Sequence, residues 1–149
     1  MFIDECGNEK DYVRTHGRAK RGVRVQDVKC GRKFGRTNVV AALCGKTVLA
    51  PKCYEHSMTG AFFDDWFLNE LLPCLRKGQT VSMDNASFHN EKRIRSILDS
   101  SGVNLIMLPT YSPDFNPIEH KWAHMKRALP DILPIHDSLQ NAILSYLSG

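Results

Sequence analysis

Three carboxylates in distinctive short segments are the residues of this chain whose types and spacing point to chemistry. Asp4 lies in FIDECG, Asp84 in MDNASFH and Glu119 in PTYSPDFNPIEHKW, with 34 residues between Asp84 and Glu119. Carboxylates brought to one point repel one another unless a cation lies between them, and magnesium prefers oxygen ligands of this kind. The triad therefore indicates a site for two divalent metal ions that serve phosphoryl transfer on nucleic acid.

Each of these residues also has a purely structural explanation. Asp84 and Asn85 are typical turn residues whose side chains bond to nearby backbone, and Asp4 fits an exposed strand end. Glu119, the third residue after Asn116, would serve as a capping carboxylate at a helix N-terminus. The joint occurrence of all three with their flanking segments favours the metal site. We expect supporting contacts there from Asn85, His89 and Asn116.

The elements that must position the carboxylates follow from the hydrophobic pattern. Short apolar segments predict one strand that ends at Asp4, with Cys6-Gly7 turning the chain, and a second strand over 80–84. In an open α/β sheet, ligands collect beyond the carboxyl ends of parallel strands. If these two strands are parallel neighbours, Asp4 and Asp84 lie side by side. Glu119 would reach them on a helix over about 117–129, begun by proline and ended before Pro130.

The remaining segments predict a mixed α/β domain with a partly antiparallel, partly parallel sheet. Strands are expected over 38–44, 47–54 (an edge strand, because it contains Pro51) and 104–108. Helices are expected after a Thr59 cap, over 90–100 and over 137–147, the last capped by Asp137. The aromatic stripe of the first helix reads as core rather than as a cofactor site.

Length and composition restrict the class of protein. A chain of 149 residues with 42% hydrophobic and 24% charged residues suits one globular domain. It has neither an apolar run of bilayer length nor a secretory signal sequence, so we expect a cytoplasmic protein. Its five cysteines contain no CxxC pair, which favours reduced thiols. His120 and His124 lack the glutamate that follows the first histidine in zinc proteases.

The net charge of +4 is unevenly distributed along the chain. Nine of the 20 basic residues fall within 23 positions, against one acid, Asp27. Such a stretch is either a solvated loop or a surface that binds the phosphates of a nucleic acid. Beside a metal-binding triad, we expect it to bind DNA. The nine residues are Arg14, Arg18, Lys20, Arg21, Arg24, Lys29, Arg32, Lys33 and Arg36.

At these segments the chain resembles the catalytic domain of the DDE transposases, in the bacterial insertion-sequence branch of the mariner superfamily. FIDECG resembles the segment of the first catalytic aspartate, MDNASFH that of the second, and LPTYSPDFNPIEHKWAHMKR that of the third carboxylate. The resemblance covers nearly the whole chain. It implies a ribonuclease-H-like fold, a five-stranded mixed sheet flanked by α-helices.

The same resemblance implies a transposase activity. Asp4, Asp84 and Glu119 would be both the catalytic residues and the ligands of two Mg²⁺ or Mn²⁺ ions. Such enzymes cut DNA at transposon ends and join the freed 3′-hydroxyls to a target, with paired subunits. In a bacterium, the protein would be associated with the nucleoid when bound to DNA.

One departure from the family pattern concerns the N-terminus. Family members carry an N-terminal helix-turn-helix region that recognises the ends of the element, whereas here Met1 lies three residues before Asp4. We therefore expect a single catalytic domain over 1–149, with a shortened first strand. Its partner would be a second copy or a separate chain that supplies the missing region. Two alternatives stay open: an inactive remnant that binds DNA or intact transposase, and a structure-specific nuclease of the same fold.

Overall fold

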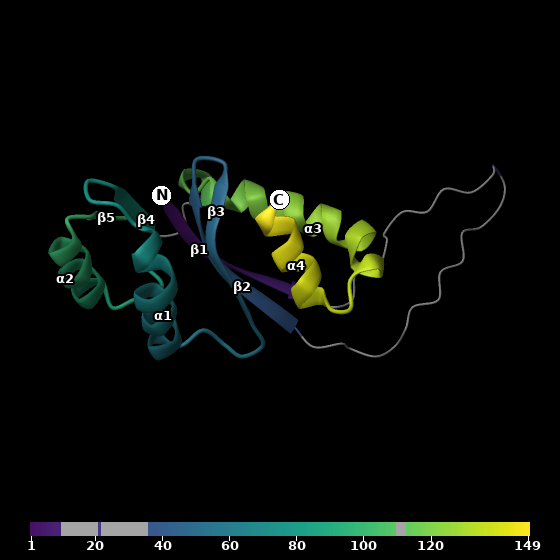
Figure 1. The fold of residues 1–149 in the computed structure, drawn as a ribbon, viewed down its shortest axis with the longest axis horizontal. Helices are drawn as coiled ribbons and strands as arrows, with labels where there is room; N and C mark the ends of the chain where they lie inside the picture. The colour runs from purple at the N-terminus through teal and green to yellow at the C-terminus, as the bar shows by residue number, and fades with distance from the viewer. Residues whose placement is uncertain (10–20, 22–35, 110–112) are drawn as a thin grey trace.

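The described part of the chain forms a mixed sheet flanked by helices (Figure 1). The computed structural model describes residues 1–9, 21, 36–109 and 113–149. Within them the strand order is β3-β2-β1-β4-β5. Strand β1 pairs antiparallel with β2 and parallel with β4, while β2–β3 is antiparallel and β4–β5 parallel. The predicted five-stranded mixed sheet is confirmed. The strands are β1 (Phe2–Glu9), β2 (Arg36–Cys44), β3 (Thr47–Tyr54), β4 (Thr80–Met83) and β5 (Asn104–Met107).

The helices alternate with the later strands, as the sequence predicts. Helix α1 continues without a break as a π-helical turn and a 3₁₀ turn, up to Cys74. The Thr59 hydroxyl accepts a hydrogen bond from the backbone of Phe62 and so caps α1, as predicted. The helices are α1 (Gly60–Trp66), the π-helix Phe67–Leu71, the 3₁₀ helix Leu72–Cys74, α2 (Glu91–Ser101), the 3₁₀ helix Pro113–Phe115, α3 (Ile118–Ile132), the 3₁₀ helix Leu133–Ile135 and α4 (Leu139–Ser148).

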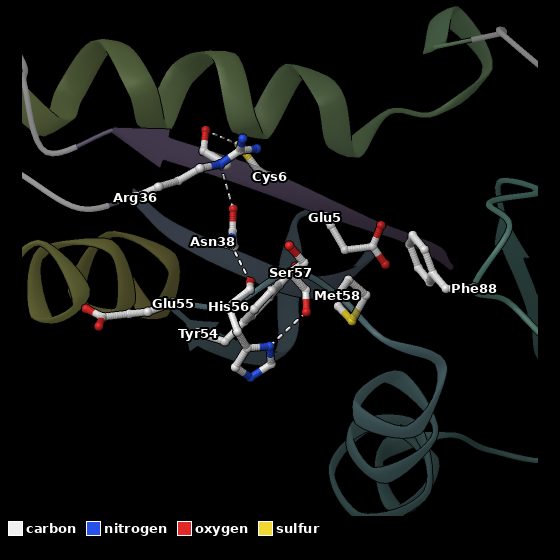
Figure 2. Close-up of a pocket in the computed structure, with 11 residues that line it drawn as sticks. Glu5, Cys6, Arg36, Asn38, Tyr54, Glu55, His56, Ser57, Met58 and Phe88 are labelled. Carbon is white, nitrogen blue, oxygen red and sulfur yellow. Dashed lines mark hydrogen bonds between the residues drawn. The ribbon is translucent and has the colours of Figure 1, made fainter. Parts of the chain in front are cut away.

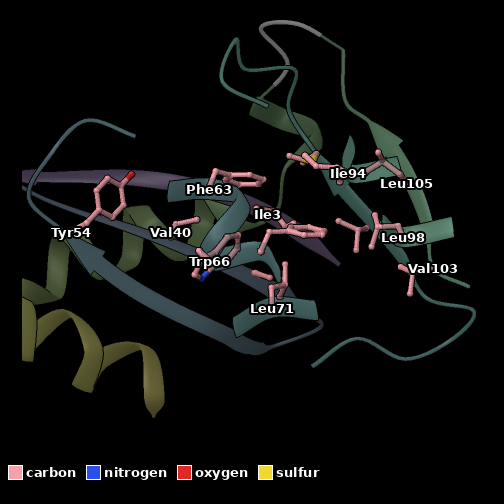
Figure 3. Packing of buried hydrophobic residues seen from close by; sticks show 14 residues of the cluster. Ile3, Val40, Tyr54, Phe63, Trp66, Leu71, Ile94, Leu98, Val103 and Leu105 are labelled. Carbon is pink, nitrogen blue, oxygen red and sulfur yellow. The ribbon is translucent and has the colours of Figure 1, made fainter. Parts of the chain in front are cut away.

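The sheet buries a separate hydrophobic core on each face. Because successive strand residues point to opposite sides, Val40 and Ala42 of β2 pack with α1 and α2, while Val39 and Ala41 pack with α3 and α4. The first core holds the aromatic stripe of α1 (Figure 3), which confirms its predicted role. Burial on both faces explains why β2 reads as a continuous apolar run.

Strand β1 is longer than predicted. It does not turn at Cys6-Gly7 but continues to Glu9, and each of its residues pairs with β2, from Phe2 opposite Leu43 to Glu9 opposite Arg36. The polar residues after Asp4 remain extended because β2 supplies partners for their backbone groups. The predicted turn at Cys6-Gly7 is therefore wrong: β1 is an eight-residue strand that pairs with a neighbour on each side.

Two helix boundaries also differ from the prediction. Helix α3 runs through Pro130 instead of ending before it. Proline costs the helix one hydrogen bond, but Leu129 is fully buried and Ile132 packs against the same core, which favours continuing the helix. Helix α4 is capped by Ser138, whose hydroxyl accepts from the backbone of Asn141, and not by Asp137.

Three further features concern the described residues. Strand β3 lies at an edge of the sheet, as its Pro51 predicts. The four described cysteines are free thiols. None of the described helices has the length and apolar character that a membrane crossing requires.

Candidate active site

Asp4 lies on β1 with its side chain on the face of the sheet that α3 covers. Cys6, two residues along and therefore on the same face, belongs to the core beneath α3. The indole Nε1 of Trp122 donates a hydrogen bond of 3.0 Å to Asp4 Oδ2. Burial, assisted by the negative charges of Glu5 and Glu119, raises the pKa of Asp4 to about 7. A buried carboxylate of this kind gains from a cation beside it.

Glu119 is brought to Asp4 by the first turn of α3. It is exposed and lies three residues before Trp122, so the two side chains share one face of the helix. Because Trp122 bonds directly to Asp4, this face of α3 is the one turned towards β1. The effect of the Glu119 charge on the pKa of Asp4 agrees with that placement.

Asp84 follows the last residue of β4, on the strand beside Asp4. Strands β1 and β4 are parallel, with Phe2 opposite Ser82. Two residues further along both strands, this register aligns Asp4 with Asp84. The Asp84 side chain is 52% exposed, and its Oδ1 accepts the backbone N–H of Ala86 at 3.3 Å. The arrangement of parallel neighbours expected for these two residues is present.

His89 lies behind Asp84 and is almost completely buried. Its Nδ1 is 3.3 Å from Asp84 Oδ1, and its Nε2 is 3.4 Å from Glu5 Oε1. Burial by itself would lower the pKa of His89, but the contacts with Asp84 and Glu5 outweigh it and raise the pKa to about 9. The hydrogen bond from His89 in turn lowers the pKa of Asp84, which therefore stays ionised at neutral pH.

The donor set suits a hard divalent cation, although its geometry is open. Asp4, Asp84 and Glu119 all offer carboxylate oxygens, the ligands that Mg²⁺ and Mn²⁺ favour. Among the described residues, no three histidine, cysteine, aspartate or glutamate side chains are close enough to hold a metal ion. Binding would therefore draw the exposed side chains of Asp84 and Glu119 towards the fixed Asp4.

The other residues expected at the site divide into three groups. Asn85 is exposed beside Asp84, whereas Asn116 is buried before α3, and its Oδ1 has no hydrogen-bond partner among the described residues. Arg21 and Arg36 are exposed, and Arg36 Nε donates to Asn38 Oδ1 at 2.9 Å. The remaining basic residues expected to bind DNA lie outside the described residues: Arg14, Arg18, Lys20, Arg24, Lys29, Arg32 and Lys33.

Sequence reasoning missed two residues of the site. It did not assign Trp122 to the site, although the spacing of three from Glu119 puts an indole donor next to the carboxylate. It did not single out Glu5. Neighbouring residues of a strand point to opposite faces, so Glu5 does not lie on the face that carries the Asp4 side chain. Contact between Glu5 and the distant His89 is visible only in the folded chain.

Trp122→Phe should weaken metal binding more than its loss of stability explains. The variant keeps a buried aromatic ring but removes the N–H that orients Asp4, and loss of such an outer contact costs roughly 10-fold in metal affinity. Calorimetric titration with Mn²⁺ measures the effect. Trp66→Phe is the matched control, because the Trp66 indole donates at 2.8 Å to the carbonyl of Ala50 in the other core. Equal Mn²⁺ affinities of the two variants would contradict the assignment.

The sheet order, with Asp4 on β1, Asp84 directly after the parallel strand β4 and Glu119 on the helix that packs across them, is that of a ribonuclease-H-like fold. Two solved structures share the fold. The Mos1 transposase paired-end complex with left transposon end superposes with a TM-score of 0.68 at 16% identity, covering 98% of this chain and 51% of that one. The HTLV-2 integrase catalytic core domain in complex with magnesium (dimeric form) has a TM-score of 0.58 at 15% identity, covering 98% and 81%.

Residues 1–140 match the DDE superfamily endonuclease family, and the chain belongs to it. Among curated proteins, the chain is 29% identical over 107 residues to the transposable element Tcb2 transposase of Caenorhabditis briggsae. This match covers 69% of this chain and 38% of that protein. It is 38% identical over 56 residues to the Tc1 transposase of Caenorhabditis elegans, covering 38% of this chain and 20% of that protein. The predicted family is confirmed, whereas the bacterial branch stays a prediction. The matches span less than two-fifths of either relative.

Proposed function

We propose that this chain is the catalytic domain of a transposase that cuts DNA at transposon ends and transfers the strands into target DNA. The observation that carries the proposal is the parallel register of β1 and β4, which aligns Asp4 with Asp84 beneath the helix that bears Glu119. Family membership supports the same class of chemistry. The domain boundaries 1–149 and the roles of the three carboxylates are part of the proposal.

Asp4, Asp84 and Glu119 would hold two Mg²⁺ or Mn²⁺ ions. Bound there, the ions would supply the Lewis acidity that activates the attacking group and stabilises the leaving oxygen in phosphoryl transfer. Asp4 is the fixed ligand, since Trp122 holds its Oδ2. Asp84 stays ionised through His89, and the exposed Glu119 is free to close on the ions. The chain thus contributes mainly positioning and charge.

DNA is the proposed partner of the basic stretch from Arg14 to Arg36. Its lysines and arginines would neutralise backbone phosphates and release their counterions. The affinity for DNA should therefore fall as the salt concentration rises. The solved relatives include a transposase with its transposon end and a dimeric integrase core. By extension from these relatives, we propose that this chain acts on DNA as a homodimer or with a partner that supplies end recognition. We propose that it does so in a bacterial cytoplasm.

Metal removal tests the function directly. The chain, incubated with DNA that carries the element's inverted repeats, should nick it in Mg²⁺ or Mn²⁺, and EDTA should stop the reaction. Addition of the end-recognition region from a relative should increase the cleavage at the ends. Nicking that persists in EDTA, or that occurs equally on DNA without the repeats in the presence of that region, would overturn the proposal.

The openness of the carboxylate arrangement favours one alternative, an inactive relative that binds DNA or pairs with intact transposase. Calorimetry separates the two possibilities without any substrate. An active site should bind Mn²⁺ in a manner that depends on all three carboxylates. At an inactive site, the heat of Mn²⁺ titration should be the same for Asp84→Asn as for the unchanged chain.

A further inference from the structure

We propose that Glu5 and His89 form a positioning pair that holds the Asp84 carboxylate from the face of the sheet opposite to Asp4. The proposal rests on the proposed function, because it assigns these residues to the same metal site. Neither of them would touch the reacting atoms; they would act through Asp84. The pair completes a continuous contact from β1, through the buried imidazole, to the loop after β4.

The imidazole of His89 is fixed in place by packing. Its side chain is 1% exposed, and its ring lies 4.3 Å from the ring centroid of Phe63 and 4.4 Å from that of Phe88. Its backbone N–H donates to Ala86 O at 2.9 Å, which closes the turn after Asp84. A ring held on both sides and through its backbone points its two nitrogens in set directions.

The Nδ1 atom is directed at Asp84. It lies 3.1 Å from the backbone oxygen of Asp84 and 3.3 Å from Oδ1. The N–H of Ala86 reaches the same Oδ1. Among the described residues, the recorded contacts of this carboxylate therefore go to Oδ1, which leaves Oδ2 as the oxygen to offer to a metal ion. Anchoring one oxygen in this way would orient the other and reduce the entropy lost on binding.

The Nε2 atom faces Glu5 and gives the imidazole its second contact. His89 Nε2 and Glu5 Oε1 are both buried, and neither has a hydrogen-bond partner among the described residues, yet they lie 3.4 Å apart. A shift of a few tenths of an ångström closes this gap to an ordinary hydrogen bond. Buried polar atoms rarely stay without partners, so each is the natural partner of the other.

Glu5 belongs to this contact rather than to Asp4. The alternation of β1 directs Asp4 to the side of α3 and Glu5 to the side of α1. There the Glu5 carboxylate lines a pocket of about 350 Å³ together with Tyr54, Met58 and Phe88 (Figure 2). The Glu5 side chain is only 16% exposed. A carboxylate that is this far buried needs a hydrogen-bond donor, and the Nε2 atom of His89 faces it at 3.4 Å.

A purely structural role for His89, filling the space between two aromatic rings, makes different predictions. His89→Phe keeps a flat ring in the core but removes both donors. His89→Asn is smaller, but its amide N–H can replace the donor at Nδ1. If the ring only fills space, the phenylalanine variant should bind Mn²⁺ more tightly than the asparagine variant. If the ring positions Asp84, the asparagine variant should bind Mn²⁺ more tightly.

The test is Mn²⁺ affinity measured by calorimetry on the full chain. His89→Phe should weaken binding by roughly 10- to 100-fold, the usual range for loss of an outer contact to a ligand, and His89→Asn should recover most of the loss. Glu5→Gln should weaken binding by a smaller factor. His136→Asn, which lies beyond the C-terminal end of α3, is the matched control and should bind as the unchanged chain does. Unchanged Mn²⁺ affinity in His89→Phe would overturn the pair while leaving the proposed function standing.

A second measurement works without metal and keeps the two proposals separable. In ¹⁵N–¹H spectra of the metal-free protein, Asp84→Asn should shift the His89 Nδ1 resonance, and Glu5→Gln should shift Nε2. If the unchanged chain binds no Mn²⁺, the proposed function fails, and these resonances still decide whether the Glu5–His89–Asp84 contact exists. Resonances that move in neither variant would overturn the contact.

Discussion

Replacing Asp84 with asparagine should abolish metal-dependent DNA cleavage. The amide keeps the size and the Oδ1 acceptor of the side chain, so the contacts with Ala86 and His89 survive. It removes the negative charge that a cation requires. Metal catalysis is worth several kcal/mol, which corresponds to a loss on the order of 10³-fold in rate.

Single-turnover nicking of end-containing DNA measures this effect, alongside calorimetric binding of Mn²⁺. Asp99→Asn is the matched control, because Asp99 is an exposed residue of α2. It makes the same change of charge for the chain as a whole, and its activity should equal that of the unchanged protein. If Asp84→Asn cleaves DNA at a rate within a factor of about ten of the control, Asp84 is not a catalytic residue. A factor of ten corresponds to about 1.4 kcal/mol of activation free energy.

Asp4→Asn should have opposite effects on activity and on stability. Cleavage should be lost, because Asp4, the proposed fixed ligand of the metal ions, loses its charge. The metal-free protein should become more stable at pH 8, since burial and the neighbouring Glu5 and Glu119 oppose ionisation of Asp4. The asparagine oxygen still accepts the Trp122 N–H. A variant that loses function while it gains stability is the mark of a residue kept for its chemistry.

The pH dependence of stability gives the sign and size of this effect. The pKa of Asp4 is about 7 in the fold against 3.8 for an aspartate free in water, so between these values the folded chain binds more protons than the unfolded chain. Stability from this group is therefore highest below pH 4, falls as the pH rises to about 7 and is constant above it. The shift sets a ceiling of roughly 4 kcal/mol. Relaxation of the site reduces it, and we expect Asp4→Asn to gain about 1–3 kcal/mol at pH 8.

Urea unfolding of the metal-free protein from pH 4 to pH 8 tests this prediction. The difference in unfolding free energy between Asp4→Asn and the unchanged chain should grow across the interval in favour of the variant. Saturating Mg²⁺ should reduce the difference, because the ion stabilises only the chain that binds it. A constant difference across the pH range would show that Asp4 ionises as an exposed carboxyl does.

The sequence by itself determined the local elements and the candidate carboxylates. Strand β3 lies where its pattern and turn residues predict, and Thr59 marks the start of α1. These features depend on neighbours within a few residues, for which propensity and capping suffice. The same is true of Asp84, which directly follows the short apolar segment of β4.

Tertiary structure decided what depends on distant partners. Strand β1 extends to Glu9 only because β2 pairs with it, and α3 continues through Pro130 because its apolar residues on either side are buried. The donation from Trp122 to Asp4 spans 118 positions, and the contact of His89 with Glu5 joins two elements on one face of the sheet. Periodicity shows which side of an element is buried but not what packs against it. The residues that carry charge could therefore be read from the sequence, whereas those that hold them in place required the fold.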